Sequence, residues 1–252
     1  MGTDLFEKVL IQLKEYTQNI ALHVFGDPLC VSDLQSYLDL ALRYDKKVHL
    51  TTTGYYIRNF SQEVFFHPSI AQINFSLNSF NKNNLKISLE DYLHPLIQLA
   101  QKKSEHRLDF FVNFRLWNKD DLESEKKFND KVLKILNENF DEISQKGKSL
   151  RLGNKILVHF DNYFQWPSLH NTTSSDGTCH GLQSQLAILS DGTIVPCCLD
   201  GFGVINLGDI KYQTLDSILQ SKKALQIIDG FKNNKAIEEL CQKCTYKHRF
   251  DK

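Results

Sequence analysis

The spacing of the cysteines constrains the last third of this sequence more than any other feature. Five of the six cysteines lie there: Cys179, Cys197, Cys198, Cys241 and Cys244. Cys241 and Cys244 form a CxxC motif, which can present two thiolates to one centre from a tight turn. A hairpin over SDGTIVPCC, residues 190–198, can present a third sulfur against it. We therefore expect four sulfur atoms to close around a metal ion or an iron-sulfur cluster.

Other interpretations of the cysteines and histidines stay open at this point. A structural zinc site has similar CxxC spacing, and His180 and His248 lie near it in the sequence. Disulfides or chance clustering are further alternatives. Cys30 stands alone and is expected to be a small buried apolar residue. His23, His49 and His159 fall inside predicted strands, where we expect satisfied core histidines.

The composition excludes several classes of protein. The chain has 252 residues, of which 41% are hydrophobic, as in ordinary folded proteins. Its 30 basic and 30 acidic residues cancel, so no bulk charge favours nucleic acid or an anionic membrane as partner. No apolar run is long enough to span a membrane, and the first ten residues, MGTDLFEKVL, do not resemble a secretion signal. We therefore expect a cytoplasmic location. In the cytoplasm, clustered thiols more often hold metal than form disulfides.

The first two thirds of the chain alternate between helical and strand patterns. Helices are predicted over 6–16, 34–44, 88–103 and 121–140, with Asp33 and Ser88 among the capping candidates. Strands are predicted over 20–26, 48–54, 71–77, 107–117 and 155–160. Strands joined by helical crossovers imply a parallel sheet or barrel. We predict an α/β fold with one domain over residues 1–165 and a smaller one over residues 166–252.

Polar or glycine-bearing segments stand where the predicted strands end, which is where ligands bind in parallel α/β folds. These segments are GDP (26–28), TTTG (51–54), FSLN (75–78) and FRLWN (114–118). In this order they resemble the motifs of the radical S-adenosylmethionine (SAM) enzymes, with GDP in place of GEP and TTTG in place of TNG. The resemblance implies a partial (β/α)6 barrel that binds SAM through Gly26, Asp27, Pro28, Thr53, Ser76, Asn78 and Arg115.

The cysteine-rich segment resembles the SPASM/twitch extension of radical SAM enzymes, which binds an auxiliary 4Fe-4S cluster. The shared features are the hairpin LAILSDGTIVPCC (186–198), a helix beginning near Thr214 and the final CxxC. The Asp191–Gly192 pair suits a type I′ turn in that hairpin. The resemblance implies the cluster ligands Cys179, Cys197, Cys241 and Cys244, with Cys198 able to substitute for Cys197.

The CxxxCxxC loop that holds the SAM-cleaving cluster of this family does not occur in the sequence. The segment MGTDLFEKVL is similar to the part of the family that follows that loop, so we expect the chain to lack the first barrel strand and the loop and to be inactive alone. The intact relative would cleave SAM to a 5′-deoxyadenosyl radical, abstract hydrogen from a peptide or small molecule, and take electrons from a donor protein. The alternatives are a non-catalytic iron-sulfur or zinc-binding remnant, an accessory module, or a cluster loop on a separate polypeptide.

Overall fold

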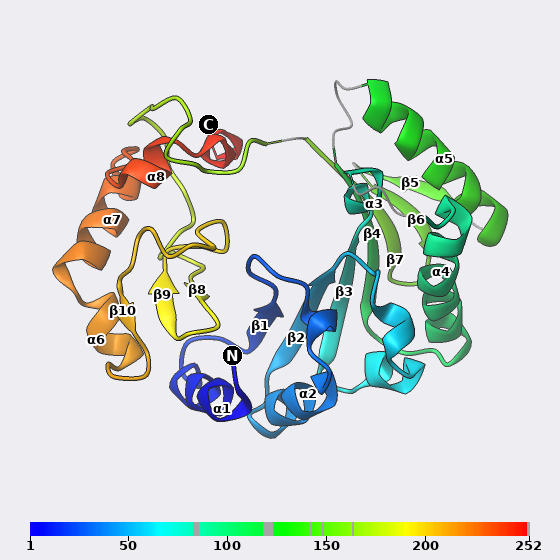
Figure 1. Ribbon diagram of the computed structural model, residues 1–252, viewed down its shortest axis with the longest axis horizontal. Helices are drawn as coiled ribbons and strands as arrows, with labels where there is room; N and C mark the ends of the chain where they lie inside the picture. The colour runs from blue at the N-terminus through cyan, green and yellow to red at the C-terminus, as the bar shows by residue number, and fades with distance from the viewer. Residues whose placement is uncertain (83–85, 118–122, 142, 148, 163, 251–252) are drawn as a thin grey trace. The chain divides into compact units, whose positions relative to one another are not determined.

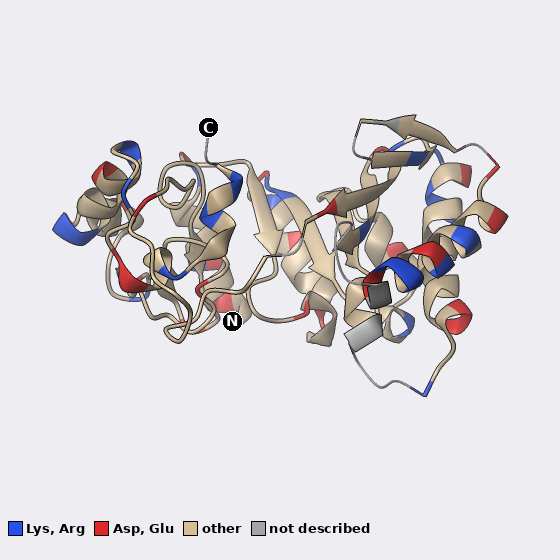
Figure 2. Ribbon diagram, turned by 90° about the horizontal axis from the view of Figure 1, so that it is seen from above, with Lys and Arg blue, Asp and Glu red and all other residues tan. Residues whose placement is uncertain are grey.

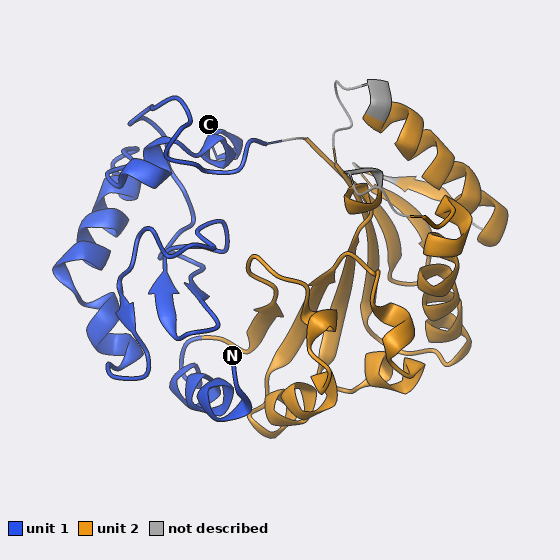
Figure 3. Ribbon diagram, in the orientation of Figure 1, with its two compact units in different colours: residues 1–16, 164–252 blue, residues 17–163 orange. Residues whose placement is uncertain are grey.

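The computed structural model describes residues 1–252 except 83–85, 118–122, 142, 148, 163 and 251–252. It divides into two compact units, unit 1 with residues 1–16 and 164–252 and unit 2 with residues 17–163 (Figure 3). The change from one unit to the other falls beside the predicted boundary at residue 165. The first helix, however, belongs to the C-terminal unit.

Charged residues are spread over both units. Basic and acidic residues are interspersed in each of them (Figure 2), in keeping with the formal net charge of zero. Among the described residues, no helix is long and apolar enough to cross a membrane.

Unit 2 is built on a seven-stranded sheet with the order β1-β2-β3-β4-β7-β6-β5 (Figure 1). Its parallel strands are β1 (Asn19–Leu22), β2 (Lys47–Thr52), β3 (Ile70–Ser76), β4 (Phe111–Trp117) and β7 (Ile156–Asp161). The antiparallel strands β5 (Ser144–Lys146) and β6 (Ser149–Gly153) extend the sheet beyond β7. The parallel strands confirm the predicted α/β architecture, and a partial barrel is consistent with them. The β5–β6 hairpin was not predicted.

The helices of unit 2 lie between the parallel strands in sequence. They are α2 (Leu34–Arg43), α3 (Asn78–Lys82), α4 (Leu89–Glu105) and α5 (Glu123–Asn139), with short 3-10 turns η1 (Pro28–Cys30), η2 (Ile57–Asn59) and η3 (Gln62–Phe66). The Asp33 carboxylate accepts a hydrogen bond from Ser36 N at 3.2 Å, and Ser88 Oγ accepts one from Asp91 N at 3.0 Å. Both predicted caps are therefore confirmed, because each satisfies a backbone donor that the first helical turn leaves free.

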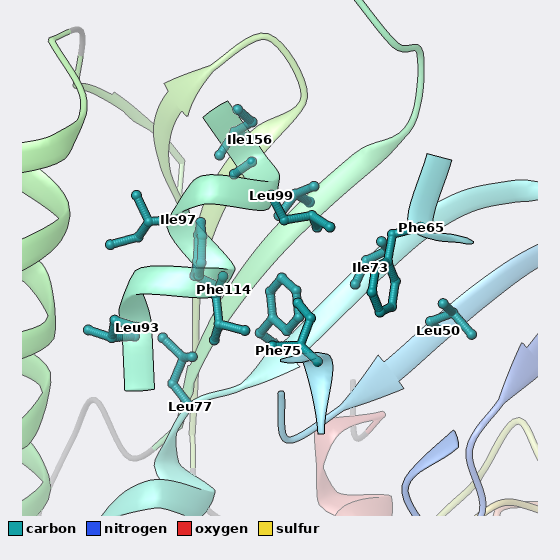
Figure 4. Close-up of a cluster of buried hydrophobic side chains, with 14 of the residues drawn as sticks. Leu50, Phe65, Ile73, Phe75, Leu77, Leu93, Ile97, Leu99, Phe114 and Ile156 are labelled. Atoms are coloured by element: carbon teal, nitrogen blue, oxygen red, sulfur yellow. The ribbon is translucent and has the colours of Figure 1, made fainter. Parts of the chain in front are cut away.

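The apolar core of unit 2 lies on one face of its sheet. Leu50, Ile73, Phe75 and Phe114 project from neighbouring strands toward leucine and isoleucine side chains of α4 (Figure 4). The residues that alternate with them along β3 and β4 are polar, among them Gln72, Asn74, Asn113 and Arg115. A parallel sheet covered by helices on both faces is apolar on both. The alternation therefore indicates that the second face of this sheet serves another purpose than core packing.

Unit 1 holds a small antiparallel sheet and short helices. The sheet has the order β10-β9-β8, with β8 (Ala187–Ile188), β9 (Thr193–Val195) and β10 (Gly208–Asp209). The helices are α1 (Thr3–Gln12), α6 (Leu215–Leu219), α7 (Lys222–Lys232) and α8 (Glu239–Gln242), followed by η4 (Thr245–Arg249). Val9 of α1 packs in the same core cluster as Ile194, and Gln12 Oε1 accepts a hydrogen bond from Leu215 N at 2.6 Å. These contacts explain why α1 belongs to unit 1.

Two sequence predictions of local structure need correction. The predicted strand 20–26 ends at Leu22, because Val24 and Phe25 have φ values of 149° and 50° that turn the chain. The helix predicted to begin near Thr214 is confirmed, since Thr214 is the N-cap of α6, and α7 follows it with Ser221 as its N-cap. The hairpin turn is not type I′, since only Gly192 of the Asp191–Gly192 pair has a positive φ, 99°. Gly192 N donates to Leu189 O at 3.0 Å, as in a type I turn that ends in a left-handed glycine.

A substitution at Gly54, which ends the TTTG segment, tests the packing of unit 2. Its φ is 84°, and an added Cβ would lie 2.8 Å from Leu96 Cδ2 in the core. We expect Gly54→Ala to lower the free energy of unfolding by about 2 kcal/mol through backbone strain and crowding. Gly153→Ala is the matched control, since the nearest atom to its Cβ would be at an ordinary 3.5 Å. Equal urea midpoints for the two variants would contradict this account of the packing.

Candidate functional site

Four cysteines of unit 1 come together from separate segments. Cys197 follows β9, Cys241 lies in α8, Cys244 caps η4, and Cys179 precedes the small sheet. Burial and, to a smaller extent, the charges of Cys198, Cys179 and Cys244 raise the pKa of Cys197 to about 12. Burial also raises the pKa of Cys241, with Cys197, Cys179 and Cys244 adding to the rise. The four thiols thus interact electrostatically with one another, and none of them forms a disulfide.

Backbone N–H groups point at three of these sulfur atoms. Cys179 interacts with the amides of Gly181 and His180, Cys197 with that of Leu199, and Cys244 with those of Tyr246 and Lys247. Each interaction opposes the rise in pKa that burial causes, because an N–H donor stabilises a thiolate. Several buried thiolates together are unfavourable without a cation, and a metal centre removes that penalty. The donor set therefore fits a metal-thiolate centre.

The spacing of the sulfur atoms bears on which centre they could hold. Among the described residues, no three His, Cys, Asp or Glu side chains lie close enough together to hold one metal ion. Four thiolates on a single zinc ion, at about 2.3 Å each, would stand only about 3.8 Å apart. In a 4Fe-4S cluster each thiolate binds a different iron, so the sulfur atoms stand further apart. Four iron-bound thiolates would therefore need a wider arrangement than four thiolates on one zinc ion.

A buried lysine holds the CxxC turn in place. Lys247 is 3% exposed, and its Nζ donates to the carbonyl oxygens of Ser174, Cys241 (3.3 Å) and Gln242 (2.9 Å). Its aliphatic stem passes Gly177, where a Cβ would lie 3.1 Å from Lys247 Cδ. The ammonium also opposes the rise in the pKa of Cys244 that burial causes. Lys247 was not identified from the sequence, because lysine side chains are mostly exposed.

In unit 2, Asp27 ties the GDP segment, which follows β1, to the carboxyl end of β2. Asp27 Oδ1 accepts hydrogen bonds from Leu29 N at 3.0 Å and Thr52 Oγ1 at 2.7 Å. Asp27 Oδ2 accepts from Thr53 N at 2.8 Å and Thr53 Oγ1 at 2.6 Å. A carboxylate has about four acceptor positions, so protein donors occupy those of Asp27. The structure brings the GDP and TTTG segments together, with Asp27 between them.

Ser76 and Arg115 are register partners on β3 and β4, and Arg115 is the register partner of His159 on β7. The Arg115 guanidinium carbon lies 4.8 Å from the centre of the Trp117 ring. Burial lowers the pKa of His159, and the Arg115 charge lowers it further. Ser76, Arg115 and His159 therefore share a row near the carboxyl ends of their strands.

Asn78 is directed elsewhere, into a buried polar contact with α5. Its Nδ2 donates to Glu125 Oε2 at 2.7 Å and to Asn129 Oδ1 at 3.3 Å, and its Oδ1 accepts from Trp117 N. All three side chains of this contact are less than 10% exposed: Asn78 6%, Glu125 3% and Asn129 6%. Asn78 thus ties the end of β3 to β4 and α5. Glu125 and Asn129 were missed, since isolated polar residues in a helix pattern give no sign of burial.

Two predictions about single residues are wrong. Cys30 is exposed at the end of η1 and not buried, because the chain turns through Gly26 and Pro28 before it. His23 lies beyond the end of β1, and its Nδ1 is buried without a hydrogen-bond partner, so it is not a satisfied core histidine. His159 does have a partner, since its Nδ1 lies 2.7 Å from Ser149 Oγ.

Comparison with known proteins agrees with both units. Residues 179–245 match the family model of the SPASM domain, an iron-sulfur cluster-binding domain. The match confirms the predicted SPASM resemblance in the cysteine-rich segment. A search of curated protein sequences finds no match.

Solved structures of radical SAM enzymes with SPASM domains share the fold. BtrN in complex with AdoMet and 2-DOIA superposes with a TM-score of 0.53 at 14% identity, over 97% of this chain and 80% of that one. Native anSMEcpe with bound AdoMet and Cp18Cys peptide gives 0.57 at 13% identity, over 98% and 79%. SuiB from Streptococcus suis bound to S-adenosylmethionine gives 0.57 at 14% identity, over 92% and 61%. At these identities the likeness concerns the fold.

Removing the Lys247 ammonium should loosen the CxxC turn. We expect Lys247→Met to lower the local free energy of opening by about 3 kcal/mol, because buried carbonyls lose their donor. Hydrogen exchange should then accelerate in the peptides around residues 174–177 and 239–249. Lys222→Met, at an exposed position of α7, is the control and should leave the exchange unchanged. Unaltered protection of both peptides in Lys247→Met would contradict the role of this lysine.

The Asp27 carboxylate should contribute more to the free energy of unfolding of unit 2 than an ordinary helix cap does. We expect Asp27→Ala to reduce the free energy of unfolding by about 3 kcal/mol, since four donors lose a charged acceptor. Asp33→Ala, which removes only the N-cap of α2, should cost about 1 kcal/mol. The comparison is made by urea unfolding. A smaller loss for Asp27→Ala than for Asp33→Ala would count against the joining role of Asp27.

Proposed function

We propose that this chain supplies the SAM-binding barrel and the auxiliary-cluster domain of a radical SAM enzyme that acts on a peptide or small molecule. The observation that carries the proposal is the gathering of Cys179, Cys197, Cys241 and Cys244 within the segment that matches the SPASM family model. The parallel sheet of unit 2 and its fold likeness to SAM-bound enzymes support the barrel assignment.

We assign Cys179, Cys197, Cys241 and Cys244 as the ligands of an auxiliary 4Fe-4S cluster. Cys197 is proposed as the ligand, with Cys198 able to substitute for it, because the Cys197 thiol is buried and interacts electrostatically with Cys179, Cys241 and Cys244. When bound, such a cluster supplies electron transfer or a coordination site for substrate. The chain's own part is to hold the thiolates with backbone N–H groups and to keep water from them by burial.

The SAM site is proposed at the carboxyl ends of β1, β2, β3 and β4. Gly26 and Pro28 offer backbone groups to the methionyl amino group, and Ser76 and Arg115 face ribose or carboxylate. Thr53 contributes by holding Asp27 through its N–H and its hydroxyl. Arginine suits a carboxylate because its planar guanidinium can donate two parallel hydrogen bonds. Asp27 and Asn78 take part by positioning the strand ends, since protein groups already bond their side-chain atoms.

SAM cleavage requires three more cysteines than the described site offers. The sequence of residues 1–252 contains no CxxxCxxC motif. The thiolates of a SAM-cleaving cluster, and a donor protein that reduces it, would therefore have to act together with these residues from outside them. The same observation favours a second candidate function, a non-catalytic iron-sulfur or zinc-binding accessory module.

Metal counting after anaerobic reconstitution tests the cluster proposal. With iron and sulfide supplied, we expect about four irons per chain, as for a single 4Fe-4S cluster. Serine variants of Cys179, Cys197, Cys241 and Cys244 should each lose most of this iron, because each removes one ligand. One zinc per chain with no retention of iron would contradict the proposal and favour the zinc-binding module.

Two other cysteines supply matched controls for the same measurement. Cys30→Ser lies in unit 2 and should retain the full iron content. Cys198→Ser should retain it as well if Cys197 is the ligand. Loss of iron in Cys198→Ser and not in Cys197→Ser would overturn that choice between the two neighbours.

A further inference from the structure

Residues 164–174, which we call the strap, follow β7 in the sequence and precede the first cysteine of unit 1. The structure describes all of them and assigns them to unit 1, and they form no helix or strand. No side chain of the strap is fully buried. A segment without a hydrogen-bonded ladder or a core of its own stays ordered only through contacts with its neighbours. The partners of the strap therefore decide whether it is ordered.

Those partners lie in residues 241–249, which carry the CxxC motif and which we call the knuckle. Thr245 Oγ1 accepts a hydrogen bond from Gln165 N at 3.0 Å and donates one to Gln165 O at 3.1 Å. Lys243 Nζ donates to Leu169 O at 2.5 Å. The backbone of the strap is thus bonded to side chains of the knuckle at two separate places.

Asn171 closes the strap on itself and fastens it to the knuckle. Its Nδ2 donates to Trp166 O at 2.8 Å and to Lys243 O at 3.2 Å. Its Oδ1 accepts from Gln165 Nε2 at 3.0 Å. One amide side chain therefore uses both its donor and its acceptor atoms to hold a bend of the strap against the knuckle.

Aromatic rings add a further contact between the strap and the knuckle. The rings of Phe164 and Tyr246 meet edge to face, with 4.9 Å between their centres. The Arg249 guanidinium carbon lies 5.3 Å from the centre of the Phe164 ring and 4.7 Å from that of Tyr246. Edge-to-face and cation–π contacts of this kind each stabilise a packed arrangement modestly. The start of the strap is therefore held by the far end of the knuckle.

The knuckle itself has little regular structure to hold its shape. The helix α8 has four residues and η4 has five. Lys243 lies between Cys241 and Cys244, and Thr245 follows Cys244 directly. Thiolate ligation of a CxxC motif fixes both cysteines to one centre and stabilises the fold around them. A filled centre would therefore fix the two residues that bond the strap.

We propose that docking of the strap is coupled to filling of the iron-sulfur centre: the filled centre fixes the knuckle, and the fixed knuckle holds the strap. Coupling is reciprocal, so the docked strap in turn slows loss of the cluster. Lys243, Thr245 and Asn171 are positioning residues in this coupling, since none of them supplies a sulfur atom. Loss of the cluster frees residues 164–174 as a flexible tether. The inference rests on the proposed function, because it concerns the regulation of the proposed cluster site.

Hydrogen exchange of the full chain, with and without the cluster reconstituted from iron and sulfide, tests the first direction of the coupling. We expect the backbone amides of the strap to exchange about tenfold more slowly when the cluster is bound. The amides of α4 in unit 2 are the internal reference and should exchange equally in both samples. Equal exchange of the strap in the loaded and unloaded protein would contradict the coupling.

Release of iron to the chelator 2,2′-bipyridine tests the reverse direction. Asn171→Leu removes three side-chain hydrogen bonds of the strap and leaves every cysteine in place. We expect it to accelerate iron release about fivefold, and Thr245→Val to act in the same way from the knuckle. Thr172→Val makes the same change as Thr245→Val at an exposed position of the strap and should release iron as the wild type does.

The same samples separate the inference from the proposed function. A chain that takes up no iron, or that holds zinc in its place, removes the proposed function and the inference with it. Full uptake of iron, with strap exchange independent of the cluster or iron release unchanged in Asn171→Leu, contradicts the inference alone. If Thr245→Val takes up less iron from the start, Asn171→Leu decides the outcome, because Asn171 lies outside the knuckle.

Discussion

The crowding of four buried thiols in unit 1 is the physical constraint on which the rest of the account depends. Burial and mutual charge hold the pKa values of Cys197 and Cys241 far above the ordinary range of a thiol, so the thiolate form is unfavourable there without a cation. The strands around them are only two or three residues long. Such a small sheet gives limited stability, and structural metal centres commonly complete units of this kind. An inorganic centre would answer both needs at once.

The two faces of the unit 2 sheet have different roles. The face beneath the helices carries the apolar core, with Phe75 and Phe114 in contact across neighbouring strands. The other face carries amides, Arg115 and His159, whose burial is tolerable only if they find partners. Asp27 ties the GDP segment to the carboxyl end of β2. Stability and recognition thus depend on different residues of the same strands.

Much of this could be predicted from the sequence, for identifiable reasons. The extended amphipathic pattern of α4 and the apolar runs of β2 and β3 are strong local signals of secondary structure. The CxxC spacing is a specific signal of a metal or cluster site. The β5–β6 hairpin was missed because Ser144–Gly153 has no clear alternation. The helix α1 could not be assigned to unit 1, since its partners in the core lie near residues 194–240. Sequence periodicity reports which residues face inward, but it does not report which distant segment they meet.

The site residues show the same limit. The segments GDP, TTTG and FSLN were found as strand ends, yet the engagement of Asp27 and Asn78 by protein donors and acceptors follows only from the tertiary arrangement. The alternation of polar and apolar residues in β4 and β7 was the available sign of a polar sheet face. X-ray absorption at the iron edge of the reconstituted protein tests the central claim most directly. We predict a shell of sulfur neighbours together with a shell of iron neighbours, as in a cluster, whereas sulfur without iron neighbours, or iron without sulfur, would contradict it.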